Sequence, residues 1–197
     1  MSIGRLAARA VIGGLFIGHG TQKLFGWFGG SGRAGTEAMM DALELRPAKV
    51  TALAAGVTET VGGSLLAAGL ATPLAGAALT GVMTTAIRKV HWPNGPWADI
   101  VGCEYNVVLI AAITELVDTG PGDLSLDHLL GTERSGPGWA LGALALGVGT
   151  AAATMAIGRR GKPATRAAAA ADDSSVDDSA AAAAHGETAG DPTTKDS

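Results

Sequence analysis

The residues best suited to chemistry are polar and ionisable side chains that interrupt long apolar stretches. These candidate residues are His19, Gln22, Lys23, Glu59, Arg88, Lys89, His91 and Glu104. An ionisable group at membrane depth is costly, so each position is a candidate for function. The spacing of His19, Gln22 and Lys23 is i, i+3 and i+4, which places all three on one face of a helix.

Several chemistries suit this set of side chains. Imidazole and carboxylate groups relay protons, and His19 and His91 with a carboxylate suit a metal ion. The cations suit an anion, such as a quinol oxygen or a sulfur oxyanion. The structural alternative is that Lys23 extends to the lipid headgroups and Glu59 pairs with one cation, so that both only fix the helix register. The residues alone leave these alternatives open.

Five apolar segments separated by polar turns must position these residues. They cover residues 3–24, 48–70, 74–90, about 101–117, and 138–157. Each is near the roughly 17–25 residues that cross a bilayer as a helix, and the last carries no charge. Only 16% of the residues are charged, against about 25% in soluble domains. The sequence therefore predicts an all-α integral membrane protein.

The connections add two features. Aromatic residues Phe25, Trp27 and Phe28 follow the first segment, as in an interfacial aromatic belt. Residues 29–35 are rich in glycine and predict a flexible loop. Residues 36–45 alternate apolar and charged positions at helical spacing, which predicts a short helix in the plane of the interface.

Short connections favour antiparallel helices, so the ends of the first two spans should meet those of the third and fourth. The candidate residues would then converge in one polar pocket. We expect His19, Glu59 and Glu104 to face the interior of the bundle. Glu115 and His128 lie near helix ends or in loops, where we expect a solvated role.

The composition excludes several classes of function. A net charge of -4 gives no electrostatic basis for binding nucleic acid. The single cysteine, Cys103, excludes an internal disulfide and a cysteine-based zinc site. With no haem-ligand pattern and no dinucleotide fingerprint, we expect no intrinsic cofactor and no metal centre.

Five short motifs resemble the DoxX family in the same order. They are RAVIG at residues 9–13, HGTQKLFG at 19–26, ETVGGSL at 59–65, LATP at 70–73 and GPGDLSLD at 120–127. The resemblance covers about residues 5–131. It implies a bacterial inner-membrane bundle of four helices, with relatives linked to quinol oxidation, thiosulfate:quinone oxidoreduction and complexes that handle oxidative and thiol stress.

This resemblance implies a domain map and a function. Residues 1–131 would form a DoxX-like four-helix transmembrane domain, 132–158 an additional transmembrane helix and 159–197 a disordered cytoplasmic polar tail. The chain would be a membrane subunit or anchor of a redox complex, with lipid and protein partners and a quinone as its ligand. Any enzyme activity would belong to a quinone-linked oxidoreductase of which it is a subunit. The alternatives are a transporter for a small solute or protons, and a membrane scaffold without chemistry.

Orientation follows from basic residues, which mark the cytoplasmic side. The strongest cluster, Arg159, Arg160, Lys162 and Arg166, predicts a cytoplasmic C-terminus. With five spans the N-terminus would then lie outside. With four spans both ends would lie inside, which better suits Arg5 and Arg9. The sequence leaves the choice open.

Overall fold

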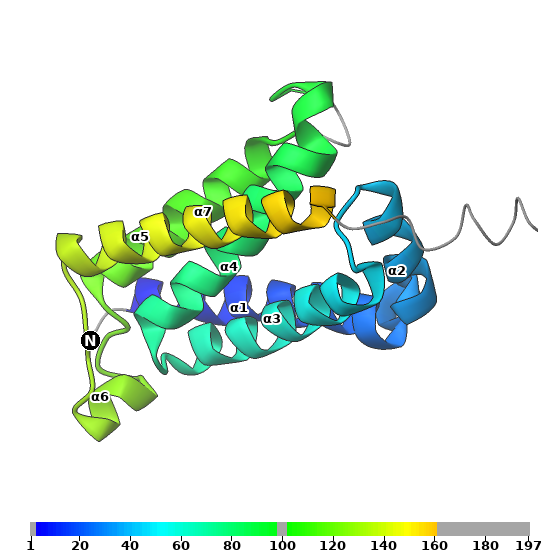
Figure 1. The fold of residues 1–197 in the computed structure, drawn as a ribbon. Helices are drawn as coiled ribbons and strands as arrows, with labels where there is room; N and C mark the ends of the chain where they lie inside the picture. The colour runs from blue at the N-terminus through cyan, green and yellow to red at the C-terminus, as the bar shows by residue number, and fades with distance from the viewer. Residues whose placement is uncertain (1–2, 98–101, 161–197) are drawn as a thin grey trace, which may run out of the picture. The chain divides into compact units, whose positions relative to one another are not determined.

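The computed structural model describes residues 3–97 and 102–160, which belong to one compact unit (Figure 1). Every regular element in these ranges is helical, which confirms the all-α prediction. The long elements are α1 (Ile3–Phe25), α2 (Gly32–Ala42), α3 (Ala48–Ala68), α4 (Thr72–Ala86), α5 (Glu104–Thr119) and α7 (Pro137–Arg160). The short ones are η1 (Trp27–Gly29), the π-helical turn η2 (Ile87–His91), η3 (Trp92–Asn94) and α6 (Leu126–Leu130). Of the predicted disordered tail at residues 159–197, Arg159 and Arg160 belong to α7, and the residues from 161 onward lie outside the described part of the chain.

The predicted flexible loop at residues 29–35 is wrong, because α2 already begins at Gly32. Gly26 turns the chain with a φ of 74°, a left-handed conformation that favours glycine. Gly30 then lies directly against Gln22, where an added Cβ would meet the Gln22 Cβ at 2.5 Å. These glycines form a tight turn, after which the Thr36 hydroxyl donates to the Gly32 carbonyl in the first turn of α2.

Of these long elements, α1, α3, α4, α5 and α7 form the bundle and run alternately up and down it (Figure 1). Gly69, with a φ of 64°, ends α3, and Pro73 in the first turn of α4 starts the return. This alternation gives the bundle two ends. The α6 end holds the start of α1, the α3–α4 turn and the start of α7. The α2 end holds the end of α1, η2 and the end of α7.

Glycines set the close approach of the helices. A Cβ added at Gly13 of α1 would lie 2.5 Å from the Gly63 carbonyl of α3, and one at Gly147 of α7 would lie 2.7 Å from the Ala77 carbonyl of α4. Small residues allow this contact in a membrane, where lipid is as apolar as a side chain. The last helix therefore packs into the same unit as the first four.

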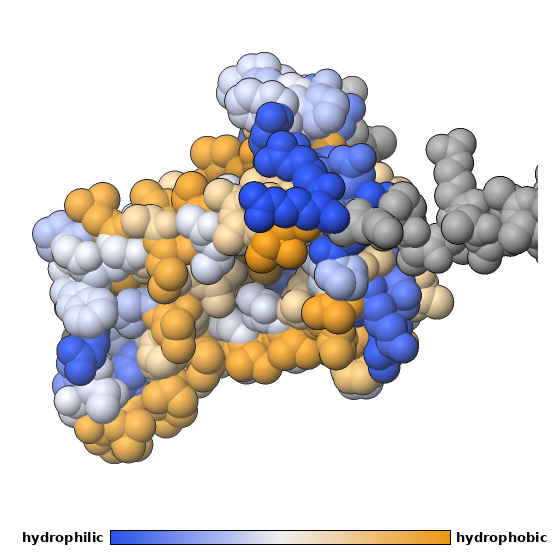
Figure 2. Space-filling model, viewed as in Figure 1, coloured by the Kyte–Doolittle hydropathy of each residue, from blue (hydrophilic) through white to orange (hydrophobic). Residues whose placement is uncertain are grey.

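The outer surface of the bundle suits lipid. Within the described residues, α3 and α7 are long and apolar enough to cross a membrane, and only 33% and 22% of their most apolar windows are buried. The core helix of a soluble protein passes the same test but is mostly buried, so these two helices favour a bilayer. Figure 2 shows apolar side chains along the side of the bundle and hydrophilic ones gathered at its two ends.

Candidate functional site

A cavity of about 730 Å³ lies among the long helices, towards the α2 end. Its volume falls within the roughly 300–1,000 Å³ of small-molecule pockets. Apolar side chains from α1 to α5 and from α7 form most of its wall, including Leu15, Phe16, Met39, Met40, Leu43, Val82, Met83 and Leu109. The polar part of the wall consists of His19, Lys23, Glu59, Lys89, His91, Tyr105 and Asn106, with threonines of α3, α4 and α7. This combination suits a largely apolar ligand with a few polar atoms.

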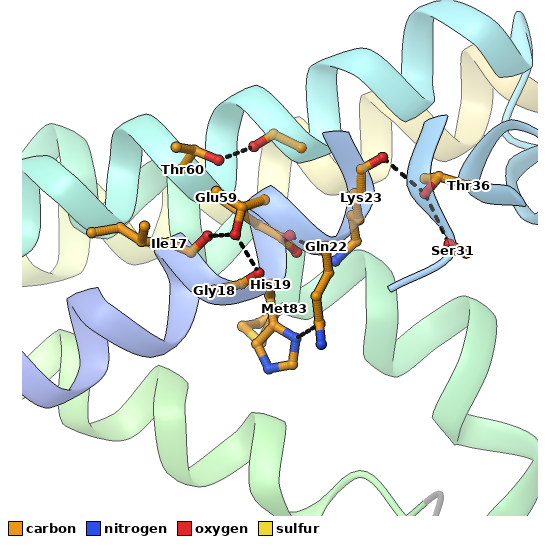
Figure 3. Close-up of polar contacts among 12 residues, drawn as sticks. Ile17, Gly18, His19, Gln22, Lys23, Ser31, Thr36, Glu59, Thr60 and Met83 are labelled. Atoms are coloured by element: carbon orange, nitrogen blue, oxygen red, sulfur yellow. Dashed lines mark hydrogen bonds and ion pairs between the residues drawn. The ribbon is translucent and has the colours of Figure 1, made fainter. Parts of the chain in front are cut away.

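An ion pair between α1 and α3 forms the centre of the polar part (Figure 3). Lys23 Nζ donates to Glu59 Oε2 at 2.6 Å. Glu59 is only 2% exposed, so its carboxylate depends on Lys23 for compensation of its charge. Charge-assisted hydrogen bonds of this kind are short and strong. The pair therefore fixes the ammonium group in the wall of the cavity.

His19 is oriented by Gln22 rather than by the ion pair (Figure 3). Its Nδ1 lies 3.1 Å from Gln22 Oε1, while Gln22 Nε2 donates to the Phe28 carbonyl. With the Gln22 oxygen as acceptor, Nδ1 carries the proton and Nε2 remains an acceptor. Gln22 itself does not line the cavity. The imidazole thus presents Nε2 as a hydrogen-bond acceptor at the wall.

The π-helical turn η2 determines which basic residues reach the cavity. Lys89 and His91 line it, whereas Arg88 is exposed and places its Cζ 5.9 Å from the centre of the Trp92 ring. Lys89 Nζ also lies 3.8 Å from Glu44 Oε2, a partner that is largely exposed. Single π-turns occur frequently at functional sites, because they redirect side chains within a helix.

The structure does not place Glu104 in the pocket, so that expectation is wrong. Glu104 is exposed in the first turn of α5, and the next residues, Tyr105 and Asn106, line the cavity instead. Asn106 Nδ2 donates to Met83 Sδ at 3.3 Å. A signal for Asn106 was present, because Asn106, Leu109 and Ile113 recur at the i, i+3, i+7 spacing of a buried helix face.

The predicted set of eight residues is therefore divided. Five of them line the cavity: His19, Lys23, Glu59, Lys89 and His91. Gln22, Arg88 and Glu104 do not. Among the described residues, no group of three or more His, Cys, Asp or Glu side chains is arranged to hold a metal ion. The donors at one side of an apolar wall suit a ligand that has a few acceptor oxygens and an apolar remainder.

A second buried polar cluster, at the α6 end, was missed by the sequence analysis. Asp127 Oδ1 accepts from the Ala71 amide at 2.9 Å, and its Oδ2 accepts from the Thr72 amide and hydroxyl at 3.1 and 3.0 Å. Arg9 is 1% exposed and donates to the Leu124 carbonyl at 2.6 Å. The GPGDLSLD motif thus supplies the cap of α4 and ties α1, α4 and α6 together. The partners of Asp127 lie more than fifty residues away in sequence. The only sequence signal for this contact was therefore the presence of both the LATP and the GPGDLSLD motifs.

Burial on its own would raise the pKa of the Asp127 carboxyl. The hydrogen bonds from the Thr72 and Ala71 amides and from the Thr72 and Thr132 hydroxyls outweigh that effect and lower the pKa below its ordinary value. Asp127 therefore stays ionised at neutral pH. The Asp127 cluster therefore has a structural role at the helix ends. The cavity remains the candidate functional site.

Comparison with known proteins gives one match. The DoxX family model matches residues 4–92, the segment from α1 to the start of η3. No curated protein and no solved structure matches the chain. The matched segment supplies all five candidate residues that line the cavity, whereas α5 and α7 close the cavity from outside the match.

Proposed function

Because residues 4–92 belong to the DoxX family, we propose that this integral membrane protein is a quinone-binding subunit of a membrane redox complex. The complex would lie in the bacterial plasma membrane. One observation supports the proposal above all: a buried Lys23–Glu59 pair, together with His19, Lys89 and His91, forms a polar patch in an otherwise apolar cavity of about 730 Å³.

The residues of the patch would bind and orient the head of the ligand. The Lys23 ammonium, which Glu59 holds in the wall, would donate to one carbonyl oxygen of the ligand. Lys89 or His91, from η2, would donate to the other. The apolar wall excludes water and accommodates the ring and the chain. Reduction of a quinone to the quinol consumes two electrons and two protons, and His19 Nε2, an acceptor at the wall, would be placed to exchange a proton with the ligand.

Electron transfer requires a partner protein in this proposal. The sequence contains one cysteine and no fingerprint of a dinucleotide site. The chain would therefore position the quinone while another subunit supplies or accepts the electrons. In a transporter the same ion pair would bind a solute or a proton, and in a scaffold it would only fix helix packing. Measurement of bound quinone distinguishes both alternatives from a quinone site.

The test uses protein purified gently from its native membrane, followed by extraction and identification of bound quinone and of copurifying proteins. In the double variant Lys23→Met/Glu59→Leu, both charges are replaced by apolar groups, so that neither is left unpaired. We expect bound quinone to fall about tenfold or more, since hydrogen bonds to charged groups contribute about 1.5–3 kcal/mol. A redox protein should copurify with the wild type.

The control is Lys49→Met/Glu115→Leu, which makes the same two changes at exposed positions outside the cavity. It should retain quinone at the wild-type level. The proposal is wrong if wild type and both variants carry equal amounts of quinone, because the quinone would then be dissolved in the surrounding lipid.

A further inference from the structure

Four leucines in α6 and just before it are exposed, although hydrogen bonds fix this segment to the rest of the protein. The α6 leucines, as we call them, are Leu124 (51% exposed), Leu126 (40%), Leu129 (78%) and Leu130 (62%). Asp127, between them in sequence, is 2% exposed and faces inward. The segment thus buries the Asp127 carboxylate and exposes its apolar side chains. A segment at a water-facing surface usually does the opposite.

The orientation of this segment is fixed by hydrogen bonds. Ser125 Oγ caps α6 by accepting from the His128 amide, and the Asp127 amide donates to the Gly69 carbonyl at 2.8 Å. The Asp127 carboxylate binds the first turn of α4 and the Thr132 hydroxyl. Rotation of α6 to bury its leucines would break these bonds. The exposure of the leucines is therefore a property of the fold.

The position of α6 indicates what covers the leucines. In Figure 1, α6 lies at the lower left corner of the bundle, next to the α3–α4 turn, to which Asp127 is hydrogen-bonded. Figure 2 shows the apolar surface of the bundle continuing onto this corner. Near the same end, Arg134 places its Cζ 5.1 Å from the centre of the Trp139 ring at the start of α7. Tryptophan is enriched at the depth of the lipid headgroups, and long arginine side chains near helix ends extend to the same depth.

From these observations, we propose that the α6 leucines insert into the acyl chains of the lipid leaflet at the α6 end. The segment is an interfacial anchor that continues the lipid-facing surface of the bundle. The occupant is lipid, because the patch is continuous with the apolar side of the bundle, whose long helices α3 and α7 are suited to cross a bilayer. This leaflet is also the one away from the more basic α2 end, so the exposed acids Asp123 and Glu133 avoid the anionic cytoplasmic surface.

The experiment measures the surroundings of a spin label in protein reconstituted into phosphatidylcholine vesicles. Leu129→Cys and, as a matched control on the same helix, His128→Cys are made with Cys103→Ala, which removes the buried native thiol. Collisions with oxygen, which concentrates in lipid, are compared with collisions with a water-soluble nickel chelate. The label at residue 129 should favour oxygen, and the label at residue 128 should favour nickel.

Two results would overturn the proposal. Nickel access at residue 129 would show that the leucines face water, and shielding from both reagents would show that protein covers them. A second measurement avoids the cysteine changes: Leu129→Trp should add emission that lipids with brominated acyl chains quench, over the emission of the four native tryptophans. Absence of that quenching would also contradict the proposal. Neither result depends on whether the cavity binds a quinone.

Discussion

Buried charges have different surroundings at the two ends of the bundle. One end holds Lys23 and Glu59, and the other holds Arg9 and Asp127. Glu59 relies on one cation in an apolar wall, so its environment can respond to a ligand. Asp127 relies on several backbone and hydroxyl donors, which makes it a structural cap. Arg9 makes one hydrogen bond, and its Nε and Nη1 atoms have no partner in the described part of the chain.

The Lys23–Glu59 pair gives the first prediction. Lys23→Met should lower the free energy of unfolding by about 3–5 kcal/mol, because it leaves Glu59 buried without its cation. The double variant Lys23→Met/Glu59→Leu should recover most of that loss, yet remain without quinone. Chemical unfolding in detergent measures the stability, and extraction measures the quinone. If the double variant recovers both the stability and the bound quinone, the ion pair contributes only to helix packing.

Asp127 gives a prediction about pH. Its folded-state pKa is lowered, so its contribution to stability is present above the ordinary pKa of about 3.9 and is lost as the pH falls through the lowered value. Asp127→Asn should destabilise the protein by about 1–3 kcal/mol at pH 7, because an amide group cannot replace all of these acceptors. The difference from wild type should shrink below about pH 4.

Thermal unfolding at several pH values measures this effect. Asp118→Asn, at an exposed position shortly before the motif, should behave like wild type. A penalty for Asp127→Asn that stays constant down to pH 3, where about nine-tenths of ordinary aspartates with a pKa of about 3.9 are protonated, would contradict the assignment.

At the scale of elements, α7 is part of the site although it lies outside the family match. Gly147 packs against α4, and Thr150, Ala151 and Thr154 of α7 line the cavity. The segment with the family motifs therefore supplies the polar head of the site, and α7 supplies part of its wall. If the cavity binds a ligand, α7 contributes to the site as well as to the packing of the bundle.

Gly147→Leu should separate α7 from α4, because a Cβ there meets both the Ala77 carbonyl and the Thr80 side chain at 2.7 Å. We expect a loss of about 1–3 kcal/mol, as for other overpacked contacts, and a loss of bound quinone. Gly142→Leu is the control, since a Cβ at that position meets nothing within 4 Å. Equal stability and quinone content in the two variants would argue against α7 as a wall of the site.

At the scale of the whole molecule, five antiparallel helices place the two termini of the described unit at opposite ends. The α2 end carries Arg33, Arg46, Lys49, Arg88, Lys89, Arg159 and Arg160. The α6 end carries Arg5, Arg9 and Arg134. If all five helices span the membrane, the positive-inside rule predicts a cytoplasmic α2 end and an external N-terminus.

Topology reporters check this orientation. A phosphatase that is active only outside the cytoplasm should be active when fused at Met1 and inactive when fused after Arg160. A fluorescent protein that folds only in the cytoplasm should give the reverse pattern. Reporters that place both ends on the same side would contradict the five-span arrangement.

The sequence alone determined the helices, the membrane class and most of the candidate residues. Helix length and apolar composition are local properties, so α1, α3 and α7 lie close to their predicted ranges. Intramembrane charge is also visible without a structure, since its cost does not depend on the partner. His19, Lys23 and Glu59 were therefore found before their contacts were known.

Only the tertiary structure decided which of these residues meet. The rotation of α5 about its axis turns Glu104 outward and Asn106 inward, and packing across several helices sets that rotation. The partners of Asp127 lie 55 and 56 residues away, and the closing of the cavity by α7 depends on a contact between Gly147 and α4. Spacing along the chain fixes what one helix presents, whereas a site between helices depends on how they pack.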